Sequence, residues 1–166
     1  MVQGYLARLD LGPTGMRRLF NLWPPFRGAG IRVTRIAPDW REAEAELRPT
    51  LLNRNFVGSH FGGSIFVMTD PFCMILMMKA LGPQYVVWDK AAGVRFLKPG
   101  RGRLTARFRL EEADVEAARR ATAAGDRHEP TFTVEVTDAA GLVVARVEKT
   151  LYIRRADAYR PALAAT

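Results

Sequence analysis

The segment GGSIFVMTDPFCMILMMKAL at residues 62–81 is the most apolar stretch of the chain, and it restricts the possible folds more than any other feature. A membrane span needs about 20 apolar residues. Here Asp70 and Pro71 stand near the centre, and a mid-membrane Asp costs roughly 2.5–3.5 kcal/mol on insertion scales. A helix that is apolar on nearly all sides must be enclosed by protein. We therefore predict a buried helix at 62–81, stopped by Gly82 and Pro83, and no membrane span.

Strand patterns follow this helix. Residues 103–110 alternate between apolar residues and a face of arginine and threonine, which is typical of a half-buried strand with a basic outer side. Further strands are predicted at 85–97, 131–137 and 142–154, and a surface helix at 110–125. Before the apolar helix we expect a short helix at 13–22 that ends at WPPFRGAG, a strand at 31–36 and a segment at 40–47 that fits either state. The fold class is therefore α+β, with an antiparallel sheet covering the apolar helix.

Length and cysteine content limit the organisation of the chain. The 166 residues fit one domain, which we place at 1–166 with its core at about 13–154 and a frayed tail after Ala156. The single cysteine, Cys73, excludes an internal disulfide framework and a Cys-rich zinc site. Cys73 is flanked by apolar residues and is expected to be an inert thiol. With only two histidines, no metal site is expected.

The formal net charge of +8 raises the possibility of a nucleic-acid partner. The basic residues are scattered, however, and no block of five or more like charges occurs. A surface that attracts anions, such as a phosphate-bearing small molecule, explains the charge equally well. No nucleic-acid partner is therefore predicted, and the N-terminal segment lacks the apolar core of a secretory signal, so we expect a cytoplasmic location.

Asp70 is the first candidate for chemistry, because it is the only acid between Glu46 and Asp89. A carboxylate on such an apolar helix faces either a polar partner or a cavity, where it can act as a general base or a nucleophile. The structural alternative is that Asp70 caps a helix that begins at Pro71.

The residues before the helix offer hydrogen-bonding groups. Gly62 and Gly63 would expose backbone N–H groups at a helix N-terminus, where an oxyanion can bind, or they would simply allow close packing. His60 is a candidate acid, base or orienting group, or a structural residue. Asn53 and Asn55 would position substrate or water, or would shape the turn.

A substrate-binding surface is predicted around the same helix and the KPGRGR turn. Methionines on the helix are expected in the core, and Met74 is a candidate for lining an apolar slot. Basic side chains near the turn would bind phosphate, or would be solvated. The candidate substrate-binding residues are Phe61, Gly62, Met74, Lys90, Lys98, Arg101 and Arg103.

The run NRNFVGSHFGGSIFVMTD at 53–70 resembles the Asn…Gly…His-Gly-Gly…Asp segment of hot-dog-fold acyl-CoA thioesterases, including the phenylacetate-pathway type. The seven-residue step from Gly63 to Asp70 matches that type. The segment YVVWDKAAGVRFLKPGRGRLTARF at 85–108 is similar to the family's long strand, turn and next strand. With FNLWPPFRGAGIRV at 20–33, the likeness covers about residues 13–154 and is greatest to a bacterial branch of unknown function.

This resemblance implies an antiparallel sheet wrapped around one long central helix, in a homodimer or homotetramer whose sheets join and whose active sites lie at the dimer interface. It implies that Asp70 is the catalytic carboxylate and that the Gly63 N–H binds the thioester oxygen. Asn53 or Asn55 would match the polar residue of the preceding loop.

Two departures from the family pattern occur. Phe61 separates His60 from the glycine pair, where the family has His directly before Gly-Gly, and Pro71 directly follows the acid. The first departure leaves the role of His60 open. The second would reorient Asp70 or remove a helix hydrogen bond.

The sequence thus predicts a thioester hydrolase for acyl-CoA, with CoA as part of the substrate and no other cofactor. The acyl chain would lie in the apolar slot, and the basic turn would hold the CoA phosphates. One alternative is a non-catalytic module that binds acyl-CoA or another lipid. A hot-dog dehydratase is less favoured, because it would need a His–acid pair and His60 is displaced.

Overall fold

The structure, a computed structural model, describes residues 11–51 and 53–159. Residues 160–166 of the predicted frayed tail lie outside these ranges. Six strands form one antiparallel sheet in the order β1-β2-β4-β5-β6-β3. The strands are β1 (Ile31–Ile36), β2 (Glu42–Leu47), β3 (Tyr85–Phe96), β4 (Leu104–Arg109), β5 (Thr131–Thr137) and β6 (Val143–Arg155).

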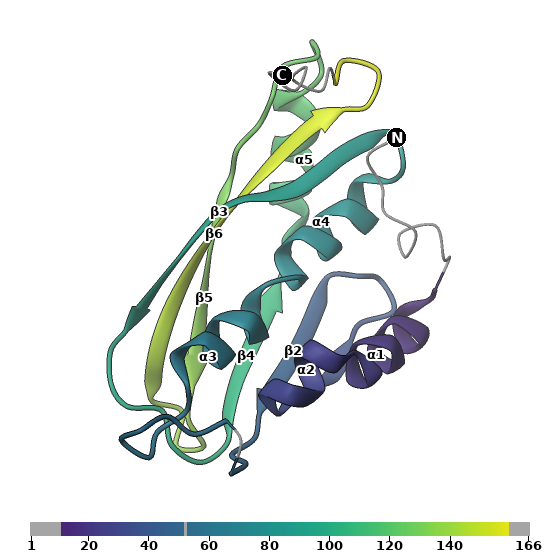
Figure 1. The fold of residues 1–166 in the computed structure, drawn as a ribbon. Helices are drawn as coiled ribbons and strands as arrows, with labels where there is room; N and C mark the ends of the chain where they lie inside the picture. Colours follow the sequence, from purple (N-terminus) through teal and green to yellow (C-terminus); the bar gives the residue numbers. More distant parts are fainter. Residues whose placement is uncertain (1–10, 52, 160–166) are drawn as a thin grey trace, which may run out of the picture.

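The apolar segment lies along one face of this sheet (Figure 1) as α3 (Gly62–Thr69) and α4 (Phe72–Leu81). Its length and composition would suit a membrane span, but 61% of its most apolar 18-residue window is buried inside the fold, as expected of a core helix. The predicted α+β architecture is confirmed. The single helix predicted at 62–81 is interrupted, because Pro71 has no N–H for the Val67 carbonyl. The Asp70 N–H donates to that carbonyl instead, at 3.2 Å.

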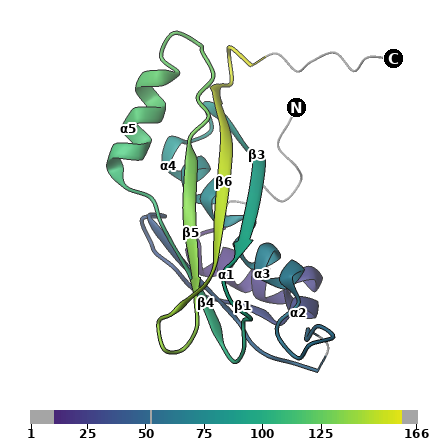
Figure 2. The ribbon, with the colours of Figure 1, turned by 90° about the vertical axis from the view of Figure 1, so that its left-hand side faces the viewer.

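The N-terminal helix α1 (Pro13–Leu22) has its predicted bounds, and WPPFRGAG holds a second short helix, α2 (Pro24–Ala29), where only a stop was expected. Prolines suit the first turn of a helix, because the N–H groups there have no intrahelical partner. Helix α5 (Glu112–Ala121) connects β4 to β5 and packs beside α4 (Figure 2), where Nη2 of Arg119 donates to the Ala80 carbonyl at 3.4 Å.

The ambiguous segment 40–47 is a strand, because its alternation matches the sheet: its alanines are buried and its glutamates face outward. These glutamates stand beside the predicted basic face of β4. Glu44 pairs with Arg107 at 2.8 Å, and Glu46 pairs with Arg103 at 3.4 Å. The basic face is therefore largely neutralised within the sheet, which gives no support to a nucleic-acid surface there.

An aromatic cluster joins the N-terminal helices to the central helix. The Phe72 ring is 1% exposed, and its centroid lies 4.6 Å from that of Phe108, 5.7 Å from Phe20 and 6.3 Å from Phe26. Such contacts connect α1, α2, α4 and β4. Phe72 is therefore the residue through which three helices share one core.

Phe72→Ala is expected to lower the free energy of unfolding by about 3–5 kcal/mol, because it removes a buried ring and leaves a cavity between rigid elements. Urea denaturation of the purified protein measures this. Leu142→Ala, at a side chain that is 59% exposed, is the control and should change stability by less than about 0.5 kcal/mol. Equal losses in the two variants would contradict this assignment of the core.

Candidate functional site

Asp70 lies at the break in the central helix. Its side chain is 53% exposed, and its Oδ1 accepts a hydrogen bond of 3.0 Å from Nζ of Lys149. The alternative role as an N-cap is not supported, because α4 begins after Pro71 and no side chain caps it. Asp70 thus has the polar partner that the sequence required, while much of its carboxylate faces outward.

Lys149 is the centre of a three-residue charged cluster under the helix. Its side chain is 1% exposed, and Nζ lies 3.0 Å from Asp70 and 3.1 Å from Oδ1 of Asp89. The Phe66 ring lies over the ammonium group, at 5.8 Å from its centroid. We call Asp70, Lys149 and Asp89 the ionic cluster.

A β-bulge places Asp89 in this cluster. Asp89 pairs with Leu151 and Ala91 pairs with Thr150, so Lys90 is the extra residue of β3. Because one extra residue exchanges the two faces of a strand, Asp89 faces the helix before the bulge and Ala92, opposite Lys149, faces it afterwards.

Burial and charge shift the titration of the ionic cluster. Burial alone would lower the pKa of Lys149, but its hydrogen bond to Asp70 and the charges of Asp89 and Asp70 outweigh burial, so the pKa is raised. Burial raises the pKa of Asp89, and the Lys149 charge offsets only part of that rise. Lys149 is therefore a permanent cation at neutral pH.

Cys73 stands beside the ionic cluster but is unsuited to nucleophilic chemistry. Burial, helped by the charge of Asp89, raises the pKa of the Cys73 thiol to about 12. Since the thiolate is the reactive form, Cys73 is inert at neutral pH, as expected from the sequence.

Gly62 and Gly63 form the first turn of α3, two turns before Asp70. Across the described ranges, neither of their N–H groups donates to a protein acceptor. The rings of Phe96 and Phe61 lie against their Cα atoms, where a Cβ would overlap them. The glycines therefore leave two free donors beneath two aromatic rings that are about half exposed.

The two asparagines of the preceding loop are used in building the loop. Asn53 is 2% exposed; its Nδ2 donates to the carbonyls of Ala29 and Arg48, and its Oδ1 accepts from the Thr50 N–H. Asn55 accepts the N–H groups of residues 57 and 59 and donates to the Ser59 hydroxyl. Both amides thus have local structural partners.

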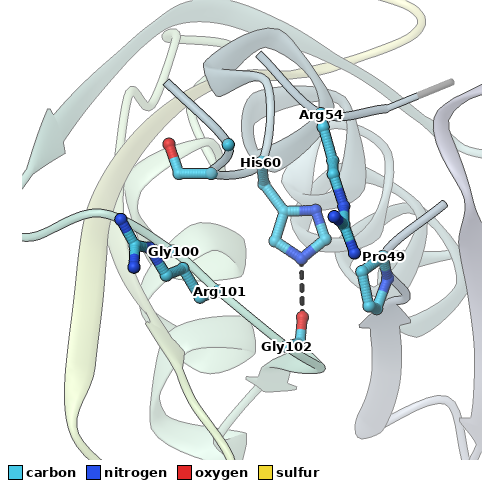
Figure 3. Close-up of a pocket in the computed structure, with 8 residues that line it drawn as sticks. Pro49, Arg54, His60, Gly100, Arg101 and Gly102 are labelled. Carbon is cyan, nitrogen blue, oxygen red and sulfur yellow. Dashed lines mark hydrogen bonds between the residues drawn. The ribbon is translucent and has the colours of Figure 1, made fainter. Parts of the chain in front are cut away.

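His60 joins this loop to the turn before β4 (Figure 3). Its ring is buried and its Nε2 lies 2.6 Å from the Gly102 carbonyl oxygen, while its backbone N–H donates to the Gly100 carbonyl. Arg54 and Arg101 stand on either side of the ring, around a pocket of about 280 Å³. In the part of the chain that the structure describes, neither arginine has an acidic partner within 4.0 Å.

The other predicted basic residues are ion-paired or distant. Lys98 pairs with Asp138 at 3.0 Å, and Lys90 pairs with Glu129 at 2.5 Å. Lys90 precedes Lys98 by eight residues of extended chain, about 25 Å, so the two do not form one cluster. Of the basic residues predicted to bind phosphate in the KPGRGR turn, Lys98 and Arg103 are ion-paired, and Arg101 takes part in none of these pairs.

A second pocket, of about 430 Å³, lies between the loop, the start of α3 and the end of β3. It is lined by Gly62, Ile65, Phe96 and Lys98, among others. Met74 lies farther along the helix, is half-buried and packs on the core. No group of three or more His, Cys, Asp and Glu among the described residues could hold a metal ion.

The structure adds Lys149 and Asp89 to the site. Lys149 stands in phase with the buried residues Ala145, Val147 and Leu151 of β6, so a lysine replaces an apolar residue on the inner face. This interruption of the apolar pattern is the sequence signal from which Lys149 could have been found. Asp89 had no such signal, because its orientation depends on the bulge.

Comparison with solved structures identifies the fold. A probable thioesterase of Pseudomonas aeruginosa is 21% identical, with a TM-score of 0.75 over 86% of this chain and 96% of that one. A thioesterase of Haemophilus influenzae is 13% identical, with a TM-score of 0.64 over 88% and 92%. The PaaI protein from the phenylacetic acid degradation operon of Escherichia coli is 15% identical, with a TM-score of 0.58 over 86% and 91%.

These likenesses lie below 25% identity and establish the fold alone. No curated protein matches the sequence. A family model described as "Domain of unknown function (DUF4442)" matches residues 14–153. The chain therefore belongs to the DUF4442 family and has the hot-dog fold of thioesterase-like proteins.

Proposed function

We propose that this protein hydrolyses acyl-CoA thioesters, with Asp70 as its catalytic carboxylate. The observation that carries the proposal is the half-exposed Asp70 at the break of the central helix, two turns after a pair of free N–H groups. The fold in which these groups stand is shared with a probable thioesterase of Pseudomonas aeruginosa and a thioesterase of Haemophilus influenzae.

The proposed reaction is the attack of water on the thioester carbonyl. The Gly63 N–H donates to the carbonyl oxygen and stabilises the negative charge that forms there. Asp70 accepts a proton from the attacking water. The C–S bond then breaks, the CoA thiolate leaves and takes up a proton, and the carboxylic acid remains. In the covalent variant, Asp70 attacks the carbonyl itself, the C–S bond breaks as the CoA thiolate leaves and takes up a proton, and water then cleaves the resulting anhydride to the carboxylic acid and free Asp70.

This chemistry requires two copies of the chain. Gly63 and Asp70 are separated by seven helical residues, about 10 Å along the axis. One water molecule cannot contact Asp70 while it attacks a carbonyl held at Gly63 of the same chain. We therefore propose a homodimer in which each site combines Gly63 of one protomer with Asp70 of its partner.

The surface around Asp70 suits such a dimer. Phe66, Cys73 and Met74 share the exposed side of the helix with Asp70, at spacings of three and four residues, and all three are half-buried. Within the described ranges β3 pairs with β6 alone, which leaves its other edge free (Figure 2). A free edge and an apolar helix face side by side favour pairing with a second copy.

Mixing two inactive variants tests this dimer. Asp70→Asn and Gly63→Pro, refolded together, should recover about a quarter of wild-type activity. Random mixing makes half of the molecules heterodimers, each with one intact site of two. Size-exclusion chromatography with light scattering checks that the mixture is dimeric. Complete inactivity of the heterodimer would place both residues of a site in one chain.

The neighbouring surface suits a ligand that is apolar at one end and anionic at the other. Phe61 and Phe96 are about half exposed beside the glycine donors, and Met74 lies farther along the helix. Arg54 and Arg101 supply positive charge beyond His60. We propose that the acyl chain lies along the helix and that these arginines attract the CoA phosphates.

A non-catalytic acyl-CoA-binding module is the second candidate, because one oxygen of the Asp70 carboxylate is already engaged in the ion pair with Lys149. A dehydratase is less well supported, since the His60 ring is bound to the Gly102 carbonyl. The expectations that no other cofactor is needed and that the protein is cytoplasmic stay predictions.

The test is thiol release from short, long and aromatic acyl-CoAs, together with the melting temperature in their presence. A hydrolase releases thiol from at least one class. Stabilisation by acyl-CoA without thiol release would identify a binding module. Because Cys73 is inert at neutral pH, it should not contribute to the thiol signal of the native protein.

A further inference from the structure

We propose that Lys149 is a positioning residue that holds the Asp70 carboxylate oriented for catalysis, and that Asp89 holds Lys149 in turn. This inference rests on the proposed function of Asp70. It assigns a role to the most deeply buried charged side chain among the described residues.

The first argument is the position of Lys149. Its neighbours on the inner face of β6, Val147 and Leu151, are buried apolar residues, and Lys149 itself is 1% exposed. Removing an ammonium group from water has a large desolvation cost, and well-packed apolar residues in place of a buried ion pair are often equally or more stable. Fold stability alone therefore does not account for a lysine at this position.

The second argument is the geometry of the contact. Nζ of Lys149, on the inner face of the sheet, donates a hydrogen bond of 3.0 Å to Oδ1 of Asp70, and the side chain of Asp70 stays 53% exposed. Among the described residues, Oδ2 of Asp70 has no hydrogen-bond partner. One oxygen is thus anchored, and the other is open to a water molecule or substrate.

The third argument is the charge balance around Lys149. The ionic cluster holds two carboxylates and one cation, and no other described cation lies within 4.0 Å of Asp70 or Asp89. The remaining neighbours are uncharged: the Cys73 thiol on α4, the Phe66 ring on α3, and Phe132, which faces Lys149 from β5. Lys149 is therefore the only cation in this set that can bind and orient the Asp70 carboxylate.

Asp89 fixes the position of the Lys149 ammonium group. It lies 3.1 Å from Lys149, on the neighbouring strand β3, and the bulge at Lys90 turns it toward the helix. With carboxylates on two elements, the ammonium group is fixed between β3 and the helix break. A fixed ammonium group limits the positions that the Asp70 carboxylate can adopt.

The test compares wild type, Lys149→Met and Lys149→Arg on the best acyl-CoA substrate. Lys149→Met should lower kcat about 100-fold and change KM less than about threefold, because misplacing a reacting group by about 1 Å has effects of this size. Lys149→Arg should recover part of kcat, since it restores a cation. Arg146→Met, on the outward face of β6, is the control and should match wild type.

A readout that does not depend on turnover separates this inference from the proposed function. In ¹³C-aspartate NMR at constant pH, the carboxyl signal of Asp70, assigned with Asp70→Asn, should change its chemical shift in Lys149→Met and return toward the wild-type value in Lys149→Arg, because the cation that contacts Oδ1 is removed and then restored. If Lys149→Met does not fold, Lys149→Met/Asp89→Asn removes the carboxylate left without a partner.

The outcomes are distinct. A folded Lys149→Met protein with wild-type kcat and an unchanged Asp70 carboxyl signal would overturn the inference. A wild type that cleaves no acyl-CoA, with the Asp70 carboxyl signal changed in Lys149→Met as expected, would overturn the proposed function and leave the contact of Lys149 with Asp70 in place.

Discussion

Asp70→Asn is expected to lower kcat/KM for the best acyl-CoA substrate by about 10³-fold. The amide has nearly the shape of the carboxylate but can neither accept a proton from water nor attack the carbonyl, and acid–base groups contribute about 10²–10⁴-fold. Because Asp70 is half exposed and Lys149 keeps Asp89 as a partner, the fold should be retained. Steady-state kinetics with thiol detection measure the effect.

Asp126→Asn is the matched control for this change. Asp126 is an exposed carboxylate in the turn after α5, and no ion pair involves it within the described ranges. It should leave kcat/KM within about twofold of wild type. The assignment of Asp70 fails if the two variants are equally active while their thermal unfolding is unchanged.

Gly63→Pro is expected to lower kcat by about 10²–10³-fold, because it deletes the N–H that would stabilise charge on the thioester oxygen. Proline is compatible with the first turn of a helix, where the N–H has no intrahelical partner. Gly63→Ala is the control for size, since a Cβ at this position also displaces the Phe61 ring but the N–H remains.

The comparison of the two Gly63 variants isolates the hydrogen bond. We expect Gly63→Ala to stay well above Gly63→Pro in kcat, with both proteins folded by circular dichroism. Equal losses in the two would mean that displacement of Phe61, and not the N–H, causes the defect.

The fold was predictable where one local pattern dominated. The apolar run at 62–81 and the alternation in β4 determined the helix and the sheet that covers it. The break at Asp70 was anticipated only as a possible lost hydrogen bond at Pro71, and one helix was predicted across it, because the apolar pattern continues on both sides. The helix Pro24–Ala29 was missed because its prolines and glycines indicate a stop, while the burial of Phe26 in the aromatic cluster stabilises the turn.

The site was less predictable, since its contacts join distant segments. Asp70 and Lys149 are 79 residues apart, and only the folded sheet brings them within 3.0 Å. The resemblance to thioesterases selected Asp70 and Gly63, whereas it could not distinguish the local structural partners of Asn53 and Asn55 from a role in catalysis.

The most direct test of thioester hydrolysis is product analysis in ¹⁸O-labelled water. Wild type and Asp70→Asn are incubated with the acyl-CoA panel, and the free acid and free CoA are quantified by mass spectrometry. The account predicts equal amounts of CoA and of acid carrying ¹⁸O, formed over many turnovers by wild type and lost in Asp70→Asn. Absence of acid from every substrate, or equal formation by both proteins, would contradict it.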